Sequence, residues 1–283
     1  LAKISLKFTG NTLGLKTNLL YWLQHTWAKL RSNTNTRHID SATLQSVQEL
    51  KTLGFTKLGP FNIKELADKA YKFLEKNQTK SLISFANKDD AATLAPLLYD
   101  LLKNHIDKVL VGYYGSYAQP YWITVMRYMA GQDGLDGSFG YHVDDNPKQL
   151  LKVFIYLNDT FESNAAFRTF DYSVTKKLIN KGFISSSTEL RNQSQSLVDK
   201  ELEKQSLKIL EGLQGTVLIF DNNLVHKGTV PRENYRDVIC VEVYPSATKW
   251  EEADIEKGLR APTTLDYPRN PFHNDILNKK SVS

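Results

Sequence analysis

The sequence predicts an α+β fold in which helices come first and a mainly β core follows. Two observations support this prediction. The first hundred residues carry apolar side chains at helical spacing, whereas from about Val109 onward β-branched and aromatic runs are separated by Gly, Asp and Asn. Helices followed by many short strands favour a double-sheet β core of jelly-roll or cupin type, buttressed by the N-terminal helices.

Helices are expected over 13–30, 41–54, 62–77 and 90–105. The first of them has Leu19, Leu23, Trp27 and Leu30 at helical spacing. We expect this face to pack on the core, and a helix that lies on a membrane surface is the alternative.

Strands are expected over 120–130, 149–159, 165–173, 215–221 and 236–246, where β-branched and aromatic residues gather. The polar stretch from Ser185 to Gln214 interrupts them. Leu197, Leu202, Leu207 and Leu210 are placed there for an amphipathic helix. We therefore expect an insertion at about 185–214 that covers one end of the strand domain.

We expect a single domain over 1–283, because no Pro/Gly/Ser-rich linker divides the chain. Within it, 1–108 would form a helical part packed on the core. The β core would occupy 109–246, and 247–283 would be a C-terminal extension.

Composition excludes several classes of protein. The one cysteine, Cys240, lies in an apolar strand and predicts a buried small hydrophobe, so no oxidising compartment is required. No run of 18 apolar residues exists, so we expect a soluble, intracellular protein without a transmembrane segment. Because the sequence begins at Leu1 without methionine, a targeting segment ahead of it stays an open alternative. The net charge of +5 is spread along the chain, which indicates a mild preference for anionic ligands and not a nucleic-acid-binding tail.

Four of the six histidines open a His-x-Asp triplet, a pattern that can hold a metal: His38, His105, His142 and His273. Only His142 is followed by the rest of a site, because His226 lies 84 residues downstream at the end of a strand and Arg236 follows ten residues later. We expect the other triplets to be structural. Asp40 of the first suits the N-cap of the helix 41–54, and His105 suits the frayed, electronegative end of the helix 90–105.

His142 and Asp144 stand two residues apart, so on a strand both side chains face one point. His226 would add a second imidazole from another strand. Two imidazoles and one carboxylate leave three positions of an octahedron open, as in non-haem iron(II) oxygenases. Asp145 is the alternative carboxylate; its position would turn it away from the metal, and we expect it beside the ligands or the substrate.

Arg236 begins an apolar strand, and a guanidinium inside a barrel is costly unless it meets an anion. A dicarboxylate that chelates iron at one end would present its far carboxylate to such a group, whose planar fork binds a carboxylate with two parallel bonds. Together with the metal ligands, Arg236 predicts 2-oxoglutarate as cosubstrate. Arg232 is a poorer candidate, because it follows Pro231 in a turn and should be solvated.

Three segments carry a resemblance to a known family: "GYHVDD" at 140–145, "KVFIYLND" at 152–159 and "FDNNLVHKGTVPRENYRDVICVEVY" at 220–244. The chain resembles the iron(II)/2-oxoglutarate-dependent oxygenase superfamily, nearest its phytanoyl-CoA dioxygenase-like branch, over roughly 110–246. The resemblance implies a double-stranded β-helix with iron held by His142, Asp144 and His226, and with 2-oxoglutarate bound by Arg236. It also suggests Tyr128 as a contact of the cosubstrate, with core packing as the alternative.

Two features bear on how far the resemblance reaches. The segment "NAAFRTFDYS" at 164–173 stands where relatives often have Gly-Pro and a Ser-His-like pair, so we expect a different substrate wall. Asp144 is retained, whereas related halogenases replace this carboxylate with a small residue, which favours oxygenase chemistry.

The expected activity is oxidation of a C–H bond by hydroxylation, desaturation or oxidative cyclisation, with release of succinate and CO2. It would need Fe(II), 2-oxoglutarate and O2, with ascorbate as a candidate reductant. Arg127, Lys152 and Arg168 lie on or near core strands and suggest a small, carboxylate-bearing substrate. One alternative is a nucleic-acid-directed oxygenase of the same superfamily, although no basic stripe with interleaved aromatics is present. The other is a cupin-like metal-binding protein without turnover, which would leave Arg236 unexplained.

Overall fold

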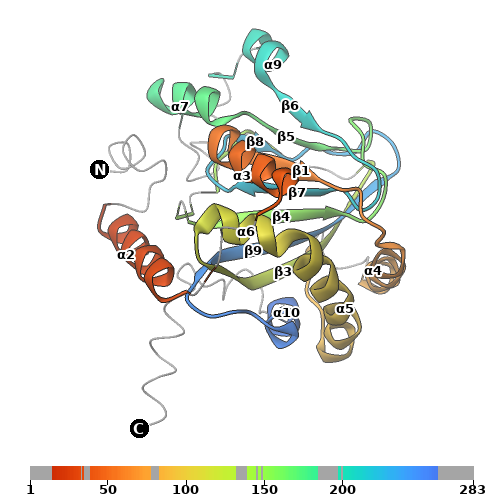
Figure 1. Ribbon diagram of the computed structural model, residues 1–283. Helices are drawn as coiled ribbons and strands as arrows, with labels where there is room; N and C mark the ends of the chain where they lie inside the picture. The colour runs from red at the N-terminus through yellow and green to blue at the C-terminus, as the bar shows by residue number, and fades with distance from the viewer. Residues whose placement is uncertain are drawn as a thin grey trace.

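The computed structural model describes residues 15–32, 34, 39–77, 83–131, 139–144, 146–147, 149–183, 197–198 and 200–260. Two antiparallel sheets and a layer of helices make up this part of the chain (Figure 1). The α+β class predicted from the sequence is confirmed. The division of the chain into parts at 108 and 246 stays a prediction.

The large sheet has the strand order β1-β7-β4-β9-β3-β2, and every neighbouring pair is antiparallel. Its strands are β1 (Phe55–Leu58), β2 (Ile83–Ser84), β3 (Tyr117–Met129), β4 (Leu151–Tyr156), β7 (Val217–Asp221) and β9 (Tyr235–Ser246). The longest pairing joins β3 to β9, from Tyr117 opposite Ser246 to Met129 opposite Tyr235.

The small sheet has the order β6-β5-β8, from β6 (Lys208–Leu210), β5 (Phe167–Thr169) and β8 (His226–Lys227). An isolated antiparallel bridge between His142 and His226 extends it by one more position beyond β8. This bridge brings the His-x-Asp triplet beside the second histidine.

The helices are α2 (Leu15–Arg31), α3 (Ser41–Leu53), α4 (Lys64–Asn77), α5 (Lys88–Leu101), η2 (Leu102–Ile106), α6 (Asp107–Tyr114), α7 (Tyr172–Asn180), α9 (Lys200–Ser206) and α10 (Glu252–Leu259). Figure 1 shows α3, α5 and α6 over one face of the large sheet, and α7 and α9 at the end where the small sheet lies. No described helix is long and apolar enough to cross a membrane.

Strand alternation gives the large sheet two different faces. In β4, Leu151, Val153 and Ile155 belong to the core beneath the helices. The intervening residues turn to the other side, where Phe154 and Tyr156 join an aromatic-rich cluster between the two sheets. The functional side chains described below all lie on this second side.

The first hundred residues are not purely helical, because β1 and β2 pair with β7 and β3 at the two edges of the large sheet. Asp40 caps α3 as predicted, since its carboxylate accepts a hydrogen bond from the backbone N–H of Thr43 at 2.8 Å. Cys240 is buried, also as predicted.

The prediction for His105 was wrong, because the helix does not end there. A π-helical turn, η2, carries the chain into α6, which ends at Gly115 with a left-handed φ of 65°. The His105 ring instead stacks on Phe61, with 4.3 Å between ring centroids. Asp107 of the same triplet accepts a hydrogen bond from Trp250 Nε1 at 2.9 Å. His38 and His273 lie outside the described residues.

The bounds of one predicted strand were also wrong. The predicted strand over 165–173 ends at Thr169, because Asp171 caps a helix, α7, by accepting a hydrogen bond from Val174 N–H. Within the described part of the predicted insertion, α9 covers Lys200–Ser206, and Leu210 belongs to strand β6 and not to the expected helix. The extent of the insertion stays a prediction.

The face predicted for the first helix was wrong as well. Leu19, Leu23, Trp27 and Leu30 of α2 are exposed. Among the side chains of α2 that the structure describes, from Asn18 onward, those of Tyr21 and Ala28 are buried.

Candidate metal centre

The two histidines of the site face each other across the antiparallel bridge. The His142 N–H donates to the His226 carbonyl at 2.8 Å, and the His226 N–H donates to the His142 carbonyl at 2.9 Å. Residues opposite each other on a bridge send their side chains to the same side of the sheet. The imidazole rings are therefore neighbours, with 4.2 Å between their centroids.

Backbone carbonyls orient both rings. His142 Nδ1 lies 2.8 Å from the Gly140 carbonyl oxygen, and His226 Nδ1 lies 2.8 Å from that of Leu224. A carbonyl oxygen can only accept, so each Nδ1 is the donor, and Nε2 is the ring nitrogen left for another partner. This is the arrangement in which a histidine binds a metal through Nε2.

Asp144 completes the set. Its Oδ1 lies 3.4 Å from His142 Nε2, and its Oδ2 lies 3.7 Å from His226 Nε2. One ligand atom from each of the three residues lies within 4.8 Å of the other two, and among the described residues no other group of three such side chains meets this condition. The Asp144 backbone N–H donates to the Asn222 carbonyl at 3.0 Å, which ties the triplet to the turn that precedes His226.

The protonation states suit a cation. Burial opposes ionisation of Asp144, but the charge of Lys152 and the neighbouring imidazoles outweigh it and hold the pKa of this carboxyl well below its usual range. Burial, reinforced by His142, lowers the pKa of His226 to about 3, so this imidazole is neutral at physiological pH. Two imidazoles and one carboxylate fit iron(II).

Lys152 of β4 lies against Asp144. Its Nζ is 2.7 Å from Asp144 Oδ2 and 3.4 Å from Glu242 Oε1. Burial alone would lower the pKa of Lys152, but the two carboxylates reverse this effect and raise the pKa well above its usual value. The chain of contacts ends at the Tyr121 hydroxyl, which donates to Glu242 Oε2 at 2.6 Å.

Sequence reasoning did not find Glu242 or Tyr121. A signal was present for Glu242, which stands six residues after Arg236 on one strand and therefore shares its face. Lys152 was considered only as a basic residue for an anionic substrate, and the structure shows it paired with two carboxylates.

The two histidines, Asp144, Lys152 and Glu242 line a cavity of about 130 Å³ between the two sheets. The large sheet supplies Trp122, Thr124, Met126 and Tyr128 from β3 and Arg236, Cys240 and Glu242 from β9, among others. An aromatic wall closes the side behind His226, where Phe167 and Phe220 lie 4.4 Å apart between ring centroids and Phe154 meets Phe220 at 4.9 Å. The wall packs against the His226 ring, with 5.4 Å between the centroids of Phe167 and His226.

Arg236 is 2% exposed and lines the same cavity. One terminal nitrogen donates to the Ala165 carbonyl, and the guanidinium lies over the Tyr128 ring at 4.4 Å from its centroid. Its Nε has no hydrogen-bond partner, and no carboxylate of the described residues forms an ion pair with it. A buried guanidinium without a negative partner favours an anion in the cavity.

Tyr128 stands opposite Arg236 in the β3–β9 register and lines the cavity. This position agrees with the predicted contact to the cosubstrate, and the role itself stays a prediction. Arg232 is exposed, as expected.

Two residues expected at the substrate do not reach the cavity. Arg127 faces the helical side of the sheet and forms a forked ion pair with Asp237 at 2.7 and 2.6 Å, between the rings of Tyr71 and Tyr235. Arg168 pairs with Glu162 at 3.0 Å. Strand alternation explains both placements, because their neighbours Tyr128 and Phe167 take the inward positions. Asp145 lies outside the described residues.

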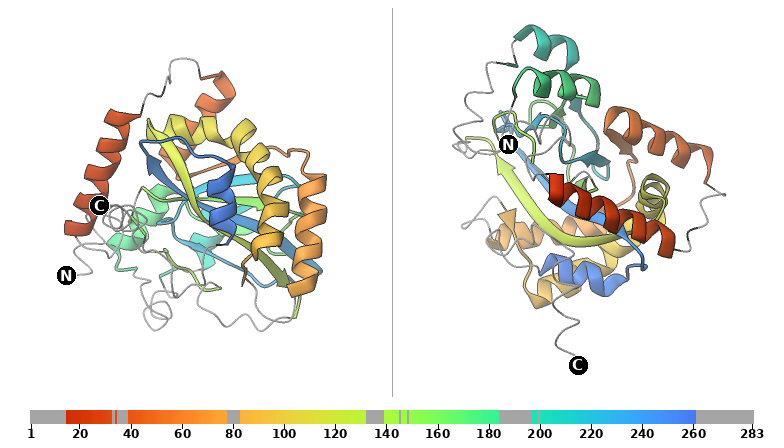
Figure 2. Two further views of the ribbon diagram at one scale, coloured as in Figure 1. Left: turned by 90° about the horizontal axis from the view of Figure 1, so that it is seen from below. Right: turned by 90° about the vertical axis from the view of Figure 1, so that its left-hand side faces the viewer.

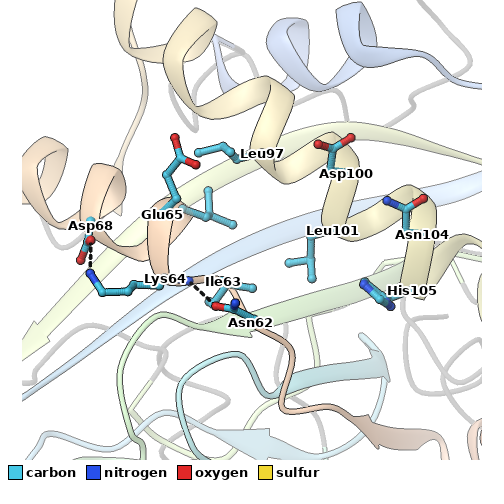
Figure 3. A pocket seen from close by; sticks show the side chains of 11 residues that line it. Asn62, Ile63, Lys64, Glu65, Asp68, Leu97, Asp100, Leu101, Asn104 and His105 are labelled. Carbon is cyan, nitrogen blue, oxygen red and sulfur yellow. Dashed lines mark hydrogen bonds and ion pairs between the residues drawn. The ribbon is translucent and has the colours of Figure 1, made fainter.

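A larger pocket, of about 520 Å³, lies elsewhere, between the start of α4 and the stretch α5–η2 (Figure 3). Asp100, Asn104 and His105 stand along one side of it, and Lys64 on the other side pairs with Asp68 at 2.8 Å. No set of metal-binding side chains converges there among the described residues. The chemistry therefore gathers in the smaller cavity.

No protein-family model matches the chain, and no curated protein matches it in sequence. Solved structures do match. One is the non-haem α-ketoglutarate-dependent carbocyclase SnoK from nogalamycin biosynthesis, with a TM-score of 0.51 and 12% identity over 75% of this chain and 86% of that chain. The chain shares its fold with this carbocyclase.

Two further structures agree with it. The epimerase SnoN in complex with Fe3+, α-ketoglutarate and nogalamycin RO matches with a TM-score of 0.51 and 9% identity, over 72% of this chain and 84% of that chain. EctD from S. alaskensis with 2-oxoglutarate (another name for α-ketoglutarate) and 5-hydroxyectoine matches with a TM-score of 0.50 and 15% identity, over 75% and 78%. At such identities the likeness concerns the fold alone. The chain thus combines this fold with an intact His142–Asp144–His226 triad, and the resemblance seen in its sequence is confirmed at the level of the fold.

Proposed function

We propose that the protein is an iron(II)- and 2-oxoglutarate-dependent dioxygenase that oxidises a C–H bond of a small organic substrate. The observation that carries the proposal is the meeting, in one cavity, of the triad and of Arg236, a buried cation without an acidic partner among the described residues. We further propose that the two sheets form a double-stranded β-helix around this cavity.

His142, Asp144 and His226 would hold iron(II), and Arg236 would bind the far carboxylate of 2-oxoglutarate through its planar fork. Bound iron with 2-oxoglutarate would supply activation of O2 for the oxidation, with succinate and CO2 as coproducts. Lys152 occupies Oδ2 of Asp144, which leaves Oδ1 as the oxygen for the metal. The aromatic wall of Phe154, Phe167 and Phe220 keeps water away.

The anionic substrate expected from the sequence gains no support from the cavity. Arg127 and Arg168 lie outside it, Lys152 is neutralised by Asp144 and Glu242, and Arg236 is assigned to the cosubstrate. Net charge alone favours an anion. We therefore propose a small organic substrate that is oxidised by hydroxylation, desaturation or oxidative cyclisation.

The test is reconstitution under nitrogen with iron(II), followed by titration with 2-oxoglutarate in a calorimeter and a succinate assay in air with ascorbate. We expect one iron per chain, 2-oxoglutarate binding that depends on it, and slow succinate formation. The variant His226→Ala should lose the iron. The matched variant His105→Ala, whose ring stacks on Phe61, should keep it.

Absence of both iron and 2-oxoglutarate binding would contradict the proposal. Iron binding without any affinity for 2-oxoglutarate would favour a metal-binding protein without turnover. Salt-dependent binding of oligonucleotides in a gel shift, with turnover on them, would favour the nucleic-acid-directed alternative.

A further inference from the structure

Helix α2 presents an apolar face to solvent. Among the described residues, twelve large hydrophobic side chains are exposed, and six of them belong to this one helix. They are Leu19, Leu20, Trp22, Leu23, Trp27 and Leu30, with exposed fractions between 48% and 81%. Exposed large apolar side chains concentrated in this way mark an interaction surface.

The opposite side of α2 fixes the helix to the protein, so the apolar face cannot simply roll inward. Tyr21 and Ala28 are buried, and His25 Nε2 lies 2.9 Å from the Tyr114 carbonyl oxygen. The rings of His25 and Tyr114 also meet edge to face at 5.7 Å. Figure 2 shows α2 at the outside of the molecule, where it lies across β9.

The charges on α2 favour a negatively charged occupant. Lys29 and Arg31 are exposed in its last turn, and the Arg31 guanidinium lies 5.7 Å from the Trp27 ring centroid. The 17 residues of the helix contain no aspartate or glutamate. Leucines in the middle, tryptophans beside them and basic residues at the end are the composition of a helix that lies in a lipid–water interface.

We propose that α2 is the docking surface of the protein for an anionic lipid membrane. The leucines and tryptophans would enter the boundary between headgroups and acyl chains, and Lys29 and Arg31 would meet the lipid phosphates. A second copy of the chain is a poorer occupant, because α2 contains no aspartate or glutamate that could pair with Lys29 and Arg31 of the other copy. The proposal does not depend on the proposed oxygenase activity.

The experiment uses flotation of the full chain with vesicles of phosphatidylcholine containing phosphatidylglycerol, and with phosphatidylcholine vesicles alone. We expect binding to the anionic vesicles, weakened by added salt, and a blue shift of tryptophan emission from Trp22 and Trp27. The double variant Leu23→Ser/Leu30→Ser should bind the anionic vesicles at least about tenfold more weakly than wild type, because two apolar anchors are lost. The charge variant Lys29→Gln/Arg31→Gln should lose the preference for anionic over neutral vesicles.

Leu213→Ser is the matched control, since Leu213 is an exposed leucine away from α2 and its loss should leave flotation unchanged. Circular dichroism and 2-oxoglutarate binding should be the same for all variants. The proposal is overturned if wild type binds no vesicles at low salt, or if Leu23→Ser/Leu30→Ser binds as well as wild type. It is also overturned if the leucine variant converts a dimer to a monomer in sedimentation while vesicles have no effect, because the face would then pair with a second copy.

Discussion

Replacing Arg236 with glutamine should remove most of the binding of 2-oxoglutarate and leave the iron site intact. A fork that makes two charge-assisted hydrogen bonds to a carboxylate gains roughly 1.5–3 kcal/mol from each. Losing it costs at least about 3 kcal/mol, and about 1.4 kcal/mol corresponds to a tenfold change in Kd. The Kd of 2-oxoglutarate should therefore rise at least about 100-fold. For Arg236→Lys the Kd of 2-oxoglutarate should lie between those of wild type and Arg236→Gln, because lysine keeps the positive charge but lacks the planar fork.

Thermal unfolding gives an independent readout of the same change. Because Arg236 is 2% exposed and has no acidic partner among the described residues, its charge destabilises the fold until an anion binds. Without 2-oxoglutarate, Arg236→Gln should therefore unfold at the wild-type Tm or above it. At 100 times the wild-type Kd, 2-oxoglutarate should stabilise wild type by about 2.7 kcal/mol and the variant by almost nothing.

The matched control is Arg232→Gln, because Arg232 is exposed and lies four residues away. It should bind 2-oxoglutarate as wild type does. Calorimetric titrations that find Arg236→Gln within a few-fold of wild type would refute the assignment. So would loss of iron from Arg236→Gln, since Arg236 would then act through the metal site.

Three further variants test the surroundings of the site. Lys152→Met should weaken iron binding roughly 10- to 100-fold in metal analysis, because Asp144 loses a partner. Unchanged iron content would contradict the role of Lys152 in positioning Asp144. Arg127→Met leaves the buried Asp237 carboxylate unpaired and should lower the free energy of unfolding in urea by about 3–5 kcal/mol. The Kd of 2-oxoglutarate should not change, and a changed Kd would indicate that Arg127 does act at the site. Gly215→Ala should destabilise the fold more than Gly131→Ala. Gly215 has φ at +88°, and an added Cβ would lie 1.9 Å from a backbone oxygen, whereas Gly131 has φ at +76° and nothing lies within 4 Å of an added Cβ. Equal midpoints of urea unfolding for the two variants would contradict this expectation.

The spacing of His142, Asp144, His226 and Arg236 was sufficient to predict that these four residues meet in one cavity, because strand parity and the length between strands constrain which residues can meet. The phase of a strand was harder to predict. Arg127 and Tyr128 are neighbours on β3, so they cannot both face the cavity, and nothing in the local sequence says which one does. The ion pair with Asp237 decides it.

Helical periodicity was likewise insufficient to predict the environment of α2. It identified Leu19, Leu23 and Leu30 as one face, but it could not say what that face meets. The predicted helix end at His105 was wrong for a local reason. The π turn at Leu102–Ile106 shifts the phase of the apolar pattern, so the helix continues where the regular spacing breaks off.

The alternation of the large sheet separates two kinds of mutational effect. In β4, β7, β9 and the part of β3 from Trp122 onward, beyond its bulge, the even-numbered residues, such as Thr124, Phe154 and Cys240, face the cavity side, and odd-numbered ones, such as Val153 and Val241, pack under the helices. A library that varies only even positions would sample new substrates while leaving the helix-facing core untouched. Selection for stability and selection for chemistry can therefore act on alternate residues of the same four strands.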